Sequence, residues 1–501
     1  MEQWLKLQNG SDIRGVAVAG VAGQPITLQD PIVRSIGFAF AQWLSEQLGK
    51  PSNELKVAVG NDSRISAQQI KTSIFQGLVS AGVTVFDSGL ASTPAMFMST
   101  IFENHSYDGS IMLTASHLPF NRNGMKFFTG EGGLEKQDIT KILTKAANVG
   151  EFTNAPTVNA TTINLMDDYT AHLVKIIRNG TGSDTPLDGL KIVVDAGNGA
   201  GGFFVSKVLQ PLGADTTGSQ FLEADGMFPN HIPNPEDPEA MAAIINAVKT
   251  NGADFGIIFD TDVDRAGAVD KNGTPINRNR FIALMATIVL EQHPGSVIVT
   301  DSVTSTGLKW WIEQKLGGQH HRFQRGYRNV INEAIRLNAA GKESWLALET
   351  SGHGALKENY FLDDGAYQIA KILIKIAQLN MSGKGTIDEL IADLPEPAEA
   401  KEFRPKIKVA DFSPYADKVL ENFAAFAAKT EGWSLTPNNY EGVHVTCDAT
   451  AGHGWALLRK SLHDPQLPLN IESEESGGVE QIASKIKGFL SSYDGLDLPG
   501  M

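Results

Sequence analysis

The chain has 501 residues, of which 42% are hydrophobic and 20% are charged, and its formal net charge is -15. This length is too great for one hydrophobic core and predicts about three to five domains of a soluble globular protein. The negative charge argues against nucleic acid as the main partner. It also means that an anionic substrate must be held by local Arg and Lys side chains.

The remaining bulk features point to a reducing compartment. The single cysteine, Cys447, excludes an intramolecular disulfide and is expected to be a small, half-buried apolar residue. The N-terminal sequence "MEQWLKLQNG" has no basic region followed by an apolar core, so we expect no secretory signal. The most apolar run, 281–290, is shorter than the ~20 residues that span a bilayer and predicts a buried helix. We therefore expect a cytoplasmic protein with no membrane partner.

Apolar, β-rich runs that end in polar or Gly-rich loops recur in pairs along the chain. The pairs are 55–64 with 109–117, 190–202 with 254–265, and 296–307 with 344–354. Continuous apolar strands with helical stretches between them predict sheets covered on both faces. In such sheets ligands bind beyond the carboxyl ends of strands. The pattern therefore predicts three related α/β domains that converge on one cleft.

Less specific sequence features indicate the domain boundaries. Residues 165–180 predict a helix that leads from the first domain into the second, and the Pro- and charge-rich stretch 392–405 predicts a linker. A smaller α+β unit follows, with a final helix over 478–493. The expected domains are 1–160 with a serine loop, 161–293 with a metal-binding loop, 294–400 with a sugar-binding loop, and 401–501 with a phosphate-binding loop.

The stretch "FDTDVDRAG" contains the strongest metal signal. Asp260, Asp262 and Asp264 alternate after a strand-like run, so extended geometry would place them on one side. Three clustered carboxylates repel one another unless a cation neutralises them, and oxygen ligands suit Mg²⁺. A calcium EF-hand is excluded because Arg265 and Lys271 occupy its sixth and twelfth positions. An Asp-rich turn without metal is the alternative. Arg265 would lie close enough to contact a metal-bound phosphate.

Two other strand ends present alternating polar residues. "ALETSGHGA" presents Glu349, Ser351 and His353, which suit neighbouring sugar hydroxyls, although a solvated turn fits as well. "WALLRKSLHD" presents a possible phosphate clamp, for which an exposed strand end is the alternative; its residues are Arg459, Ser461 and His463. Near the N-terminus, Arg14 and Arg64 stand in Gly/Asp/Ser loops. A structural ion pair with a nearby Asp is possible for each and is the preferred interpretation for Arg64.

Ser116 follows the apolar run 109–113 and does not fit the G-x-S-x-G elbow of a hydrolase. Asn121, Asn123 and Gly124 predict a tightly turned loop that also contains Lys126. A helix cap or turn serine is one interpretation. A phosphate-carrying serine is the other, because a dianionic phosphoserine would complete the metal shell begun by the three Asp residues.

These motifs resemble those of the α-D-phosphohexomutase family, the phosphoglucomutases and phosphomannomutases. "TASHLPFNRNGMKF" is similar to the T-[GA]-S-H-N-P…N-G-[FIM]-K serine loop, "DTDVDRAG" to the D-x-D-x-D-R metal loop, and "LETSGHG" to the G-E-x-S-G-H sugar loop. "GSDIRG", "GNDSR", "GLASTPA", "VDAGNGAGG" and "FPNHIPNPE" follow the family's order. The resemblance covers nearly the whole chain. It implies three structurally related α/β domains plus a smaller C-terminal α+β domain around a central cleft.

The resemblance also implies roles for individual residues. Ser116 would be phosphorylated and would hold Mg²⁺ with Asp260, Asp262 and Asp264. Substrate would be bound by Glu349, Ser351 and His353 at the sugar and by Arg459, Ser461 and His463 at the distal phosphate. The residues expected to surround the transferring phosphoryl group and to assist proton movement are Arg14, His117, Lys126, Arg265 and His353.

Three positions depart from the family pattern. Leu118 stands where Asn is usual, and Leu348 stands where Gly is usual. The C-terminal loop "RKSLHDPQLP" replaces R-x-S-G-T-E-P, so that Leu462 and His463 take the place of a Gly-Thr pair. That pair would offer close backbone N–H contacts to the distal phosphate.

The implied reaction interconverts hexose 1-phosphate and hexose 6-phosphate, of glucose or mannose, through a phosphoserine and a 1,6-bisphosphate. Hexose 1,6-bisphosphate would serve as activator, and the chain would be a monomer or homodimer. One alternative is an aspartyl-nucleophile sugar phosphatase, because "IIFDTDVD" resembles the D-x-D-x-[TV] strand end of haloacid-dehalogenase-type enzymes. Asp264, however, replaces the Thr or Val of that motif. The other alternative is a sugar-phosphate-binding protein without turnover.

Overall fold

The structure is a computed structural model that describes residues 2–150, 152, 156–461 and 464–501. The chain folds into two compact units, one formed by Met1–Phe281 with Ser351–Leu390 and the other by Ile282–Thr350 with Ile391–Met501. Among the described residues, no helix is both long and apolar enough to cross a membrane.

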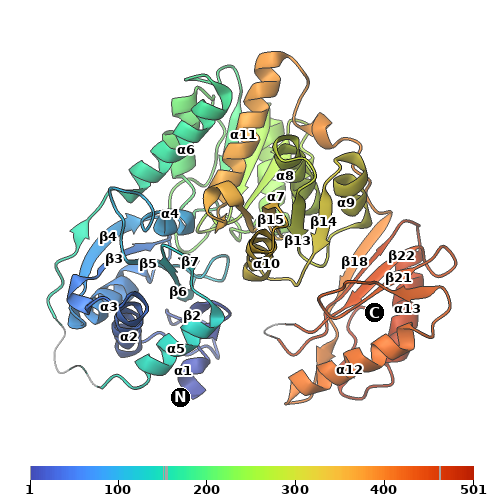
Figure 1. The fold of residues 1–501 in the computed structure, drawn as a ribbon, viewed down its shortest axis with the longest axis horizontal. Helices are drawn as coiled ribbons and strands as arrows, with labels where there is room; N and C mark the ends of the chain where they lie inside the picture. Colours follow the sequence, from blue (N-terminus) through green and yellow to red (C-terminus); the bar gives the residue numbers. More distant parts are fainter. Residues whose placement is uncertain (1, 151, 153–155, 462–463) are drawn as a thin grey trace. The chain divides into compact units, whose positions relative to one another are not determined.

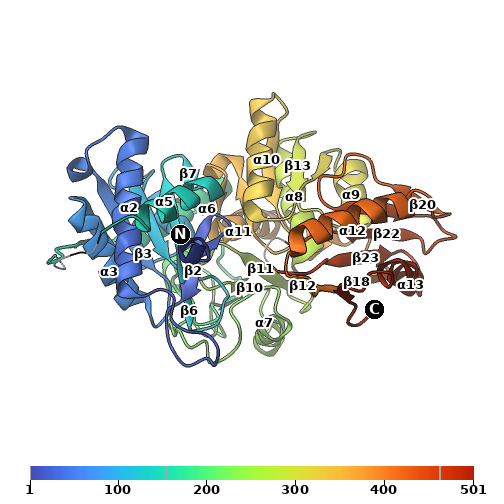
Figure 2. The ribbon, with the colours of Figure 1, turned by 90° about the horizontal axis from the view of Figure 1, so that it is seen from below.

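The first unit begins with a mixed sheet whose strand order is β1-β2-β6-β5-β3-β4-β8, and β7 pairs with β6. Its strands are β1 (Gln8–Asn9), β2 (Asp12–Val16), β3 (Lys56–Asn61), β4 (Thr84–Leu90), β5 (Gly109–Leu113), β6 (Arg122–Thr129), β7 (Gly132–Gly133) and β8 (Thr161–Thr162). Its helices are α1 (Glu2–Leu5), α2 (Asp30–Leu48), η1 (Ser52–Glu54), α3 (Ala67–Ser80), α4 (Thr93–Met98) and α5 (Lys136–Ala146). Helices α2, α3 and α5 lie on one face of this sheet, and α4 lies on the other (Figures 1 and 2).

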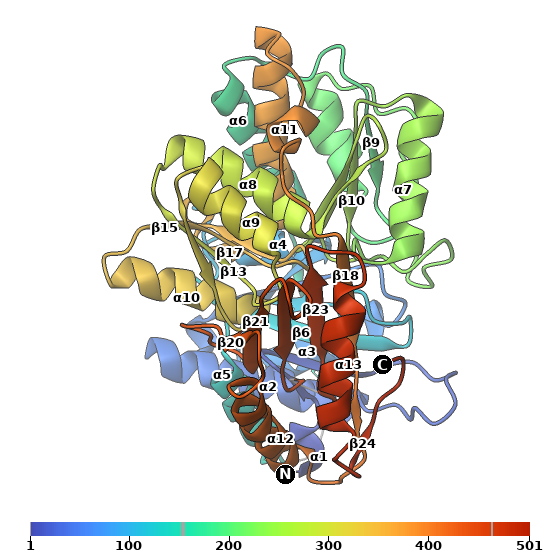
Figure 3. The same ribbon diagram turned by 90° about the vertical axis from the view of Figure 1, so that its right-hand side faces the viewer.

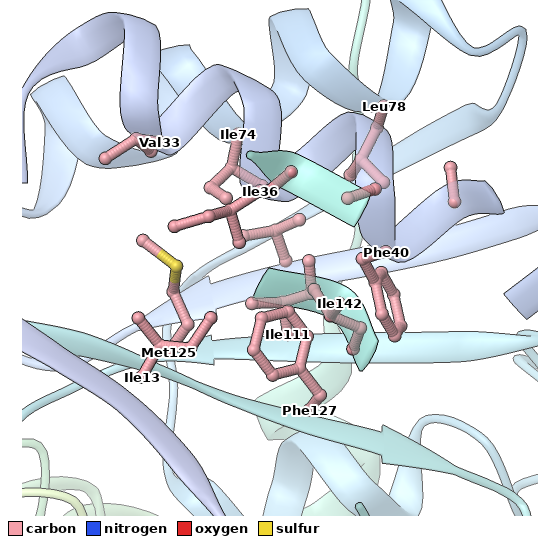
Figure 4. Close-up of a cluster of buried hydrophobic side chains, with 14 of the residues drawn as sticks. Ile13, Val33, Ile36, Phe40, Ile74, Leu78, Ile111, Met125, Phe127 and Ile142 are labelled. Atoms are coloured by element: carbon pink, nitrogen blue, oxygen red, sulfur yellow. The ribbon is translucent and has the colours of Figure 1, made fainter. Parts of the chain in front are cut away.

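The core of this first sheet forms where its strands meet α2, α3 and α5. Apolar side chains of the strands point up to those of the helices, and all are almost fully buried (Figure 4); the labelled residues are Ile13, Ile111, Met125 and Phe127 below and Val33, Ile36, Phe40, Ile74, Leu78 and Ile142 above. Each such side chain contributes about 1.5–3 kcal/mol when it leaves water. This packing makes the sheet a firm base for the loops at its strand ends.

The first unit continues with a four-stranded sheet of order β12-β11-β10-β9. Its strands are β9 (Ile192–Asp195), β10 (Phe255–Phe259), β11 (Ala266–Asp270) and β12 (Pro275–Ile276). Helix α7 (Pro238–Asn251) lies along β9 and β10 (Figure 3), and its apolar residues share a core with both strands. The remaining elements are α6 (Leu165–Thr181), η2 (Val205–Leu209), η3 (Gln210–Leu212), the hairpin of β16 (Gly354–Leu356) and β17 (Leu362–Asp363), η5 (Lys357–Asn359), and α11 (Gly365–Ser382).

The second unit contains a parallel sheet and a C-terminal antiparallel sheet. Strand β13 (Val297–Thr300) pairs in parallel with β14 (Gln319–Arg322) and with β15 (Ser344–Leu348). The antiparallel sheet has the order β18-β23-β22-β21-β20. Its strands are β18 (Glu399–Phe403), β20 (Trp433–Leu435), β21 (Val443–Cys447), β22 (Gly454–Leu458) and β23 (Leu469–Ser473), with β19 (Lys406–Ile407) paired separately to β24 (Leu496–Asp497). The helices are α9 (Thr306–Trp310), η4 (Trp311–Lys315), α10 (Tyr327–Ala339), α12 (Phe412–Ala427) and α13 (Gly478–Leu490). Two further helices, α8 (Arg278–Gln292) and η6 (Asp388–Ile391), begin in the first unit and end in the second.

The two strands of each predicted pair are neighbours in a sheet, which the sequence had not predicted. Strands β3 and β5 are parallel neighbours in the first sheet, β9 and β10 in the second, and β13 and β15 in the third. The helices predicted over 165–180, 281–290 and 478–493 correspond to α6, α8 and α13. Ser116, Asp260 and Glu349 all follow the second strand of their pair, which is where the α/β rule places ligands.

Gly77 lets α3 approach α2 closely. A Cβ on Gly77 would lie 2.1 Å from Arg34 O and 2.8 Å from Phe38 N. We expect Gly77→Ala to destabilise the fold by about 1–3 kcal/mol, because helix backbone is less able to yield than a side chain. Gly488→Ala is the matched control: Gly488 also lies in a helix, a Cβ there meets nothing within 4 Å, and the change should stabilise by up to ~1 kcal/mol. Thermal unfolding followed by circular dichroism measures both, and equal stabilisation by the two changes would contradict the packing.

Cys447 lies on β21 in the C-terminal core, where burial raises the pKa of its thiol to about 12. The thiolate is the reactive form. We expect a thiol-reactive disulfide reagent to label native protein at pH 8 about a thousandfold more slowly than urea-unfolded protein, because labelling must wait for this core to open. The chain has one cysteine, so the signal has one source. Equal rates in the two states would show that the strand is not buried in solution.

Candidate active site

Ser116 lies in a sharp turn directly after β5. Its φ of 51° is in the left-handed region, which costs a non-glycine residue about 1–3 kcal/mol unless the surroundings hold it. The Ser116 backbone N–H donates a hydrogen bond to Thr114 Oγ1 at 2.9 Å. The residue is only 3% exposed. Ser116 therefore occupies a strained and buried turn rather than an exposed one.

Arg64 fixes the conformation of residues 116–122, the serine loop, by hydrogen bonds to their backbone oxygens. Its guanidinium donates to the backbone oxygens of Ser116 and Leu118 at 2.5 and 2.6 Å, and to those of Pro119 and Arg122 at 2.8 and 2.9 Å. Its Nε lies 3.3 Å from Asp62 Oδ2, and neither side chain is exposed. The ion pair predicted for Arg64 is therefore confirmed. Its larger contribution, satisfying four loop carbonyls at once, was not predicted.

The three aspartates follow β10 in a tight loop. One carboxylate oxygen of each lies within 4.8 Å of one from each of the other two, and all three side chains are fully buried. The expectation of extended geometry is wrong, because β10 ends at Phe259, β11 begins at Ala266, and Val263 between them has a φ of 66°. A turn, rather than strand alternation, brings Asp260, Asp262 and Asp264 together.

Lys126 and His353 are two basic side chains beside the loop formed by residues 260–264, which we call the acidic loop. Lys126 Nζ contacts Asp264 Oδ2 and lies 3.3 Å from Asp262 Oδ2. His353 Nδ1 lies 2.7 Å from Asp363 Oδ2 and 3.9 Å from Asp264 Oδ1. The sequence pattern predicts Lys126 in the loop that carries Ser116, but Lys126 lies on β6. The strand sets its direction more rigidly than a loop would.

Arg265 joins the acidic loop to the serine loop. Its Nη2 donates to Asp260 Oδ2 and to Ser116 Oγ, each at 3.0 Å, and lies 2.7 Å from His117 Nδ1. Ser116 Oγ in turn donates to Asp260 Oδ2 at 3.1 Å. The hydroxyl predicted to carry phosphate is thus in direct contact with both an arginine and a predicted metal ligand. The structure brings these four residues together from two separate sheets.

The local charges set the protonation of the acidic loop. Burial, followed by the charge of Asp264, raises the pKa of Asp260 well above its usual range. Burial also opposes ionisation of Asp264, but Lys126, His353 and Arg265 outweigh it and hold the Asp264 pKa below its usual range. Neighbouring carboxylates therefore cannot all ionise freely without a further positive charge.

The two histidines of the site are in opposite charge states. Burial, followed by Arg265 and Arg14, lowers the pKa of His117 to about 3, so its imidazole is neutral at pH 7. For His353, burial is outweighed by Asp363 and Asp264, which raise the pKa to about 9. His353 is therefore an imidazolium and contributes positive charge to the site.

The acidic loop fits a hard divalent cation. Asp262 Oδ1 and Asp264 Oδ1 are buried and have no hydrogen-bond partner among the residues that the structure describes. A buried carboxylate oxygen without a partner is costly, and an oxygen-only donor set suits Mg²⁺. Thr93 also donates to Asp262 Oδ2 from the start of α4, a contact that the sequence motifs did not reveal. The Thr93 hydroxyl fixes the Asp262 carboxylate and leaves its other oxygen available.

Four further predicted site residues are Arg14, Ser351, Ser461 and His463. Arg14, predicted near the phosphoryl group, lies on β2 and donates to Asp12 Oδ2 at 3.0 Å. Ser351 is buried near the start of the hairpin β16–β17. His463 lies outside the described residues. Ser461 Oγ accepts a hydrogen bond from the Asp464 backbone N–H at 3.2 Å.

In the second unit, Arg459 directly follows β22 and is paired with Glu441. The distance from Arg459 Nη1 to Glu441 Oε1 is 3.8 Å, and both side chains are largely buried. The other carboxylate oxygen of Glu441 accepts from Ser302 Oγ and from the Arg325 backbone N–H at 3.1 Å. Burial lowers the pKa of Arg459, and the Glu441 charge opposes that effect. Glu441 therefore offsets part of the cost of burying the Arg459 charge.

Glu349 and Asp301 directly follow β15 and β13, two neighbouring strands of the parallel sheet in this unit. Glu349 Oε1 accepts from the Gly326 backbone N–H at 2.6 Å. Asp301 Oδ2 accepts from Thr350 Oγ1 at 2.7 Å and lies 3.8 Å from Arg325 Nε. Sequence reasoning singled out Glu349 but missed Asp301, Arg325 and Glu441. The signal for Asp301 was present, since it stands at a strand end in the predicted pair 296–307.

Comparison with known proteins places this geometry in a family. Three models described as phosphoglucomutase/phosphomannomutase, alpha/beta/alpha domains I, II and III, match residues 6–154, 167–273 and 277–397. A phosphoglucomutase of Neisseria gonorrhoeae is 30% identical over 483 residues, which is 96% of this chain and 97% of that protein. A phosphomannomutase of Salmonella typhimurium is 35% identical over 93% of this chain and 95% of its own. A Burkholderia thailandensis family protein of known structure has a TM-score of 0.78 and 27% identity over 99% of both chains.

The chain belongs to the phosphoglucomutase/phosphomannomutase family, whose members are hexose phosphate mutases. It is an intramolecular phosphotransferase, an isomerase of carbohydrate metabolism. The predicted family and the three α/β domains with a further C-terminal domain are thereby confirmed.

Removing one carboxylate of the acidic loop should weaken metal binding. We expect metal-free protein to bind one Mn²⁺, detected by loss of the free-ion electron paramagnetic resonance signal, and Asp262→Asn to weaken binding at least about tenfold. Asp195→Asn is the matched control, because Asp195 is an equally buried carboxylate at the end of β9 that is occupied by His231 and Gln220. Unchanged Mn²⁺ affinity in Asp262→Asn would exclude this loop as the metal site.

Proposed function

We propose that the protein interconverts hexose 1-phosphate and hexose 6-phosphate, of glucose, mannose or both, with Ser116 as the phosphate carrier. The observation that carries this proposal is the contact of Ser116 Oγ with both Arg265 and Asp260. A serine that only shapes a turn hydrogen-bonds to nearby backbone groups, whereas the hydroxyl of Ser116 contacts a buried guanidinium and a carboxylate. The names of the relatives, phosphoglucomutase and phosphomannomutase, support the hexose substrate.

The transfer exchanges one ester for another. The bond between phosphorus and Ser116 Oγ breaks while a bond to a free hexose hydroxyl oxygen forms, which gives a hexose 1,6-bisphosphate. The electron pair of the broken bond stays on Ser116 Oγ, which in the net exchange takes the proton given up by the hexose hydroxyl and becomes a neutral hydroxyl again. After the bisphosphate turns around, its other phosphoryl group returns to Ser116. The same bisphosphate, supplied from solution, would phosphorylate an unmodified Ser116 and so act as activator.

The first unit's basic side chains are suited to stabilise the charge on the moving phosphoryl group. Arg265 already donates to Ser116 Oγ, and Lys126 and the His353 imidazolium add two further charges in the same buried cluster. In phosphoryl transfer, positioning and charge neutralisation supply most of the catalysis. His117 is neutral and accepts from Arg265, so its proposed role is to orient that guanidinium toward the serine.

Asp260, Asp262 and Asp264, with phosphorylated Ser116, would hold Mg²⁺, which would neutralise the phosphoryl oxygens. We assign Glu349, Ser351 and His353 to the sugar hydroxyls. Arg459, Ser461 and His463 are assigned to the phosphate that is not being transferred. Arg14 is assigned to the phosphoryl group. For Arg459, support comes from its burial and from its pairing with the carboxylate of Glu441, which a dianionic phosphate can replace.

Ser116→Ala tests the carrier role. Mass spectrometry of purified wild-type protein should find phosphate on the peptide that contains Ser116, and the variant should lose at least about a thousandfold in turnover because no phosphoenzyme forms. Ser110→Ala is the matched control, since Ser110 is a buried serine of the preceding strand whose hydroxyl donates to Met96 O. It should keep wild-type turnover.

Glucose 1-phosphate, mannose 1-phosphate and glucosamine 1-phosphate are assayed in parallel, with Mg²⁺ and a bisphosphate activator. Isomerised product from one of them identifies the sugar. Full turnover by Ser116→Ala would refute the phosphoserine route. Release of inorganic phosphate without isomerised product would favour the aspartyl phosphatase.

A further inference from the structure

A cavity with a basic lining lies beside β2 in the first unit. It has a volume of about 430 Å³ and is bordered by the segment 3–7, by β2, by the segment 27–32 and by the start of β6. Lys6, Arg14 and Arg122 line it, and none of its described lining residues is acidic. In a chain with a net charge of -15, three cations around one cavity indicate an anionic ligand.

The strand register sets the spacing of the two arginines. Val16 pairs with Arg122, and Arg14 pairs with Gly124. Alternate residues of a strand share a face, so Arg14, Val16 and Arg122 project on the same side of the sheet. Diagonal neighbours of this kind are about 7–8 Å apart at Cα, which lets two long guanidinium side chains converge on one phosphate.

Arg122 has no protein partner to compete with a ligand. Its guanidinium makes no hydrogen bond or ion pair with any residue that the structure describes, and its Nε is buried. Arg14 is paired through Nη2 with Asp12 at 3.0 Å, but its Nε is likewise buried without a hydrogen-bond partner among the described residues. A buried donor that lacks an acceptor costs about 1–3 kcal/mol, which a bound anion would offset. The pair of Lys6 with Glu2 is solvent-exposed and therefore weak.

The rest of the lining is apolar. Trp4, Leu7, Val16 and Ile32 supply it, and Trp4 is half-buried against the core of the first sheet. An apolar wall beside a basic patch suits a ligand that has both an anionic phosphate group and an apolar body. We propose that this cavity binds a phosphate ester, with its phosphate on Arg14 and Arg122 and the body of the ester against Trp4.

Arg14 links this cavity to the proposed reaction. Arg14 already lines the cavity, and it is assigned above to the phosphoryl group of the reaction. A ligand that pairs with the Arg14 guanidinium in the cavity neutralises this charge, so turnover falls without competition for the hexose phosphate site. This consequence rests on the proposed function, whereas binding in the cavity does not. The site is therefore an inhibitory site for phosphate esters.

Binding is tested on Ser116→Ala protein by isothermal titration and by hydrogen exchange of residues 3–7 and 27–32. The probes are inorganic phosphate, a nucleoside monophosphate and a hexose phosphate. We expect protection of both segments and an affinity that falls at least about tenfold in Arg122→Gln. Arg34→Gln is the control, because Arg34 is an arginine of the same unit that also has a buried, unpartnered Nε but lies outside the cavity. It should bind as its parent does.

The three probes distinguish the source of the ester. Tighter binding of the nucleoside monophosphate than of inorganic phosphate, lost in Trp4→Leu, identifies an aromatic ester, and tighter binding of the hexose phosphate identifies a sugar ester. Titrations of Arg122→Gln that match those of its parent, or no protection of 3–7 by any probe, would overturn the proposal.

In otherwise wild-type protein, Arg122→Gln should keep basal turnover and lose the noncompetitive part of inhibition by the tightest-binding probe. Persistence of that part would overturn the inhibitory role. If Ser116→Ala kept turnover, the proposed reaction would fail while the binding result would still stand.

Discussion

The first unit's site depends on keeping buried carboxylates neutralised. Asp260, Asp262, Asp264 and Asp363 are all nearly inaccessible to water, and an ionised carboxylate left alone in such surroundings is strongly unfavourable. Arg265, Lys126 and His353 supply three compensating charges, and burial together with the charge of Asp264 raises the pKa of Asp260. A divalent cation and a dianionic phosphoserine would enter this cluster as a balanced pair. That balance gives a physical reason for proposing that metal and phosphate bind together.

The charges that balance one another come from distant parts of the chain, so the sheets must be rigid. Ser116 follows β5, Lys126 stands on β6, and Arg265 precedes β11. Each strand belongs to a sheet whose residues at these positions are buried. Arg64 then shapes the serine loop by occupying its carbonyl oxygens, which a flexible loop would otherwise expose to water. Stable sheets and a buried arginine together hold a strained serine in one position.

The second unit uses the same principle with fewer charges. Arg459 and Arg325 lie among Glu441 and Asp301, and all four are drawn from loops at strand ends. Arginine keeps its charge on burial more readily than lysine and offers several donors, so it suits the proposed site, where a phosphate would replace a carboxylate. The altered C-terminal loop of this chain therefore retains an arginine with a defined counter-charge even though the usual Gly-Thr pair is absent.

The amino-acid sequence alone determined the main strands, the long helices, Ser116 as the unusual residue and the Asp loop as the metal candidate. These features are local, because periodicity and short motifs depend on residues a few positions apart. The tertiary structure decided that the Asp loop is a turn rather than an extended strand end and that Lys126 points from a strand. It also decided that Arg64 binds the serine loop, that Glu441 pairs with Arg459, and that Arg122 faces a basic cavity. Each of these depends on which loops the sheets bring together. Sequence pattern does not show which distant residue pairs with a given charge. Burying a charge without a partner is costly, so the folded chain must bring a partner to it.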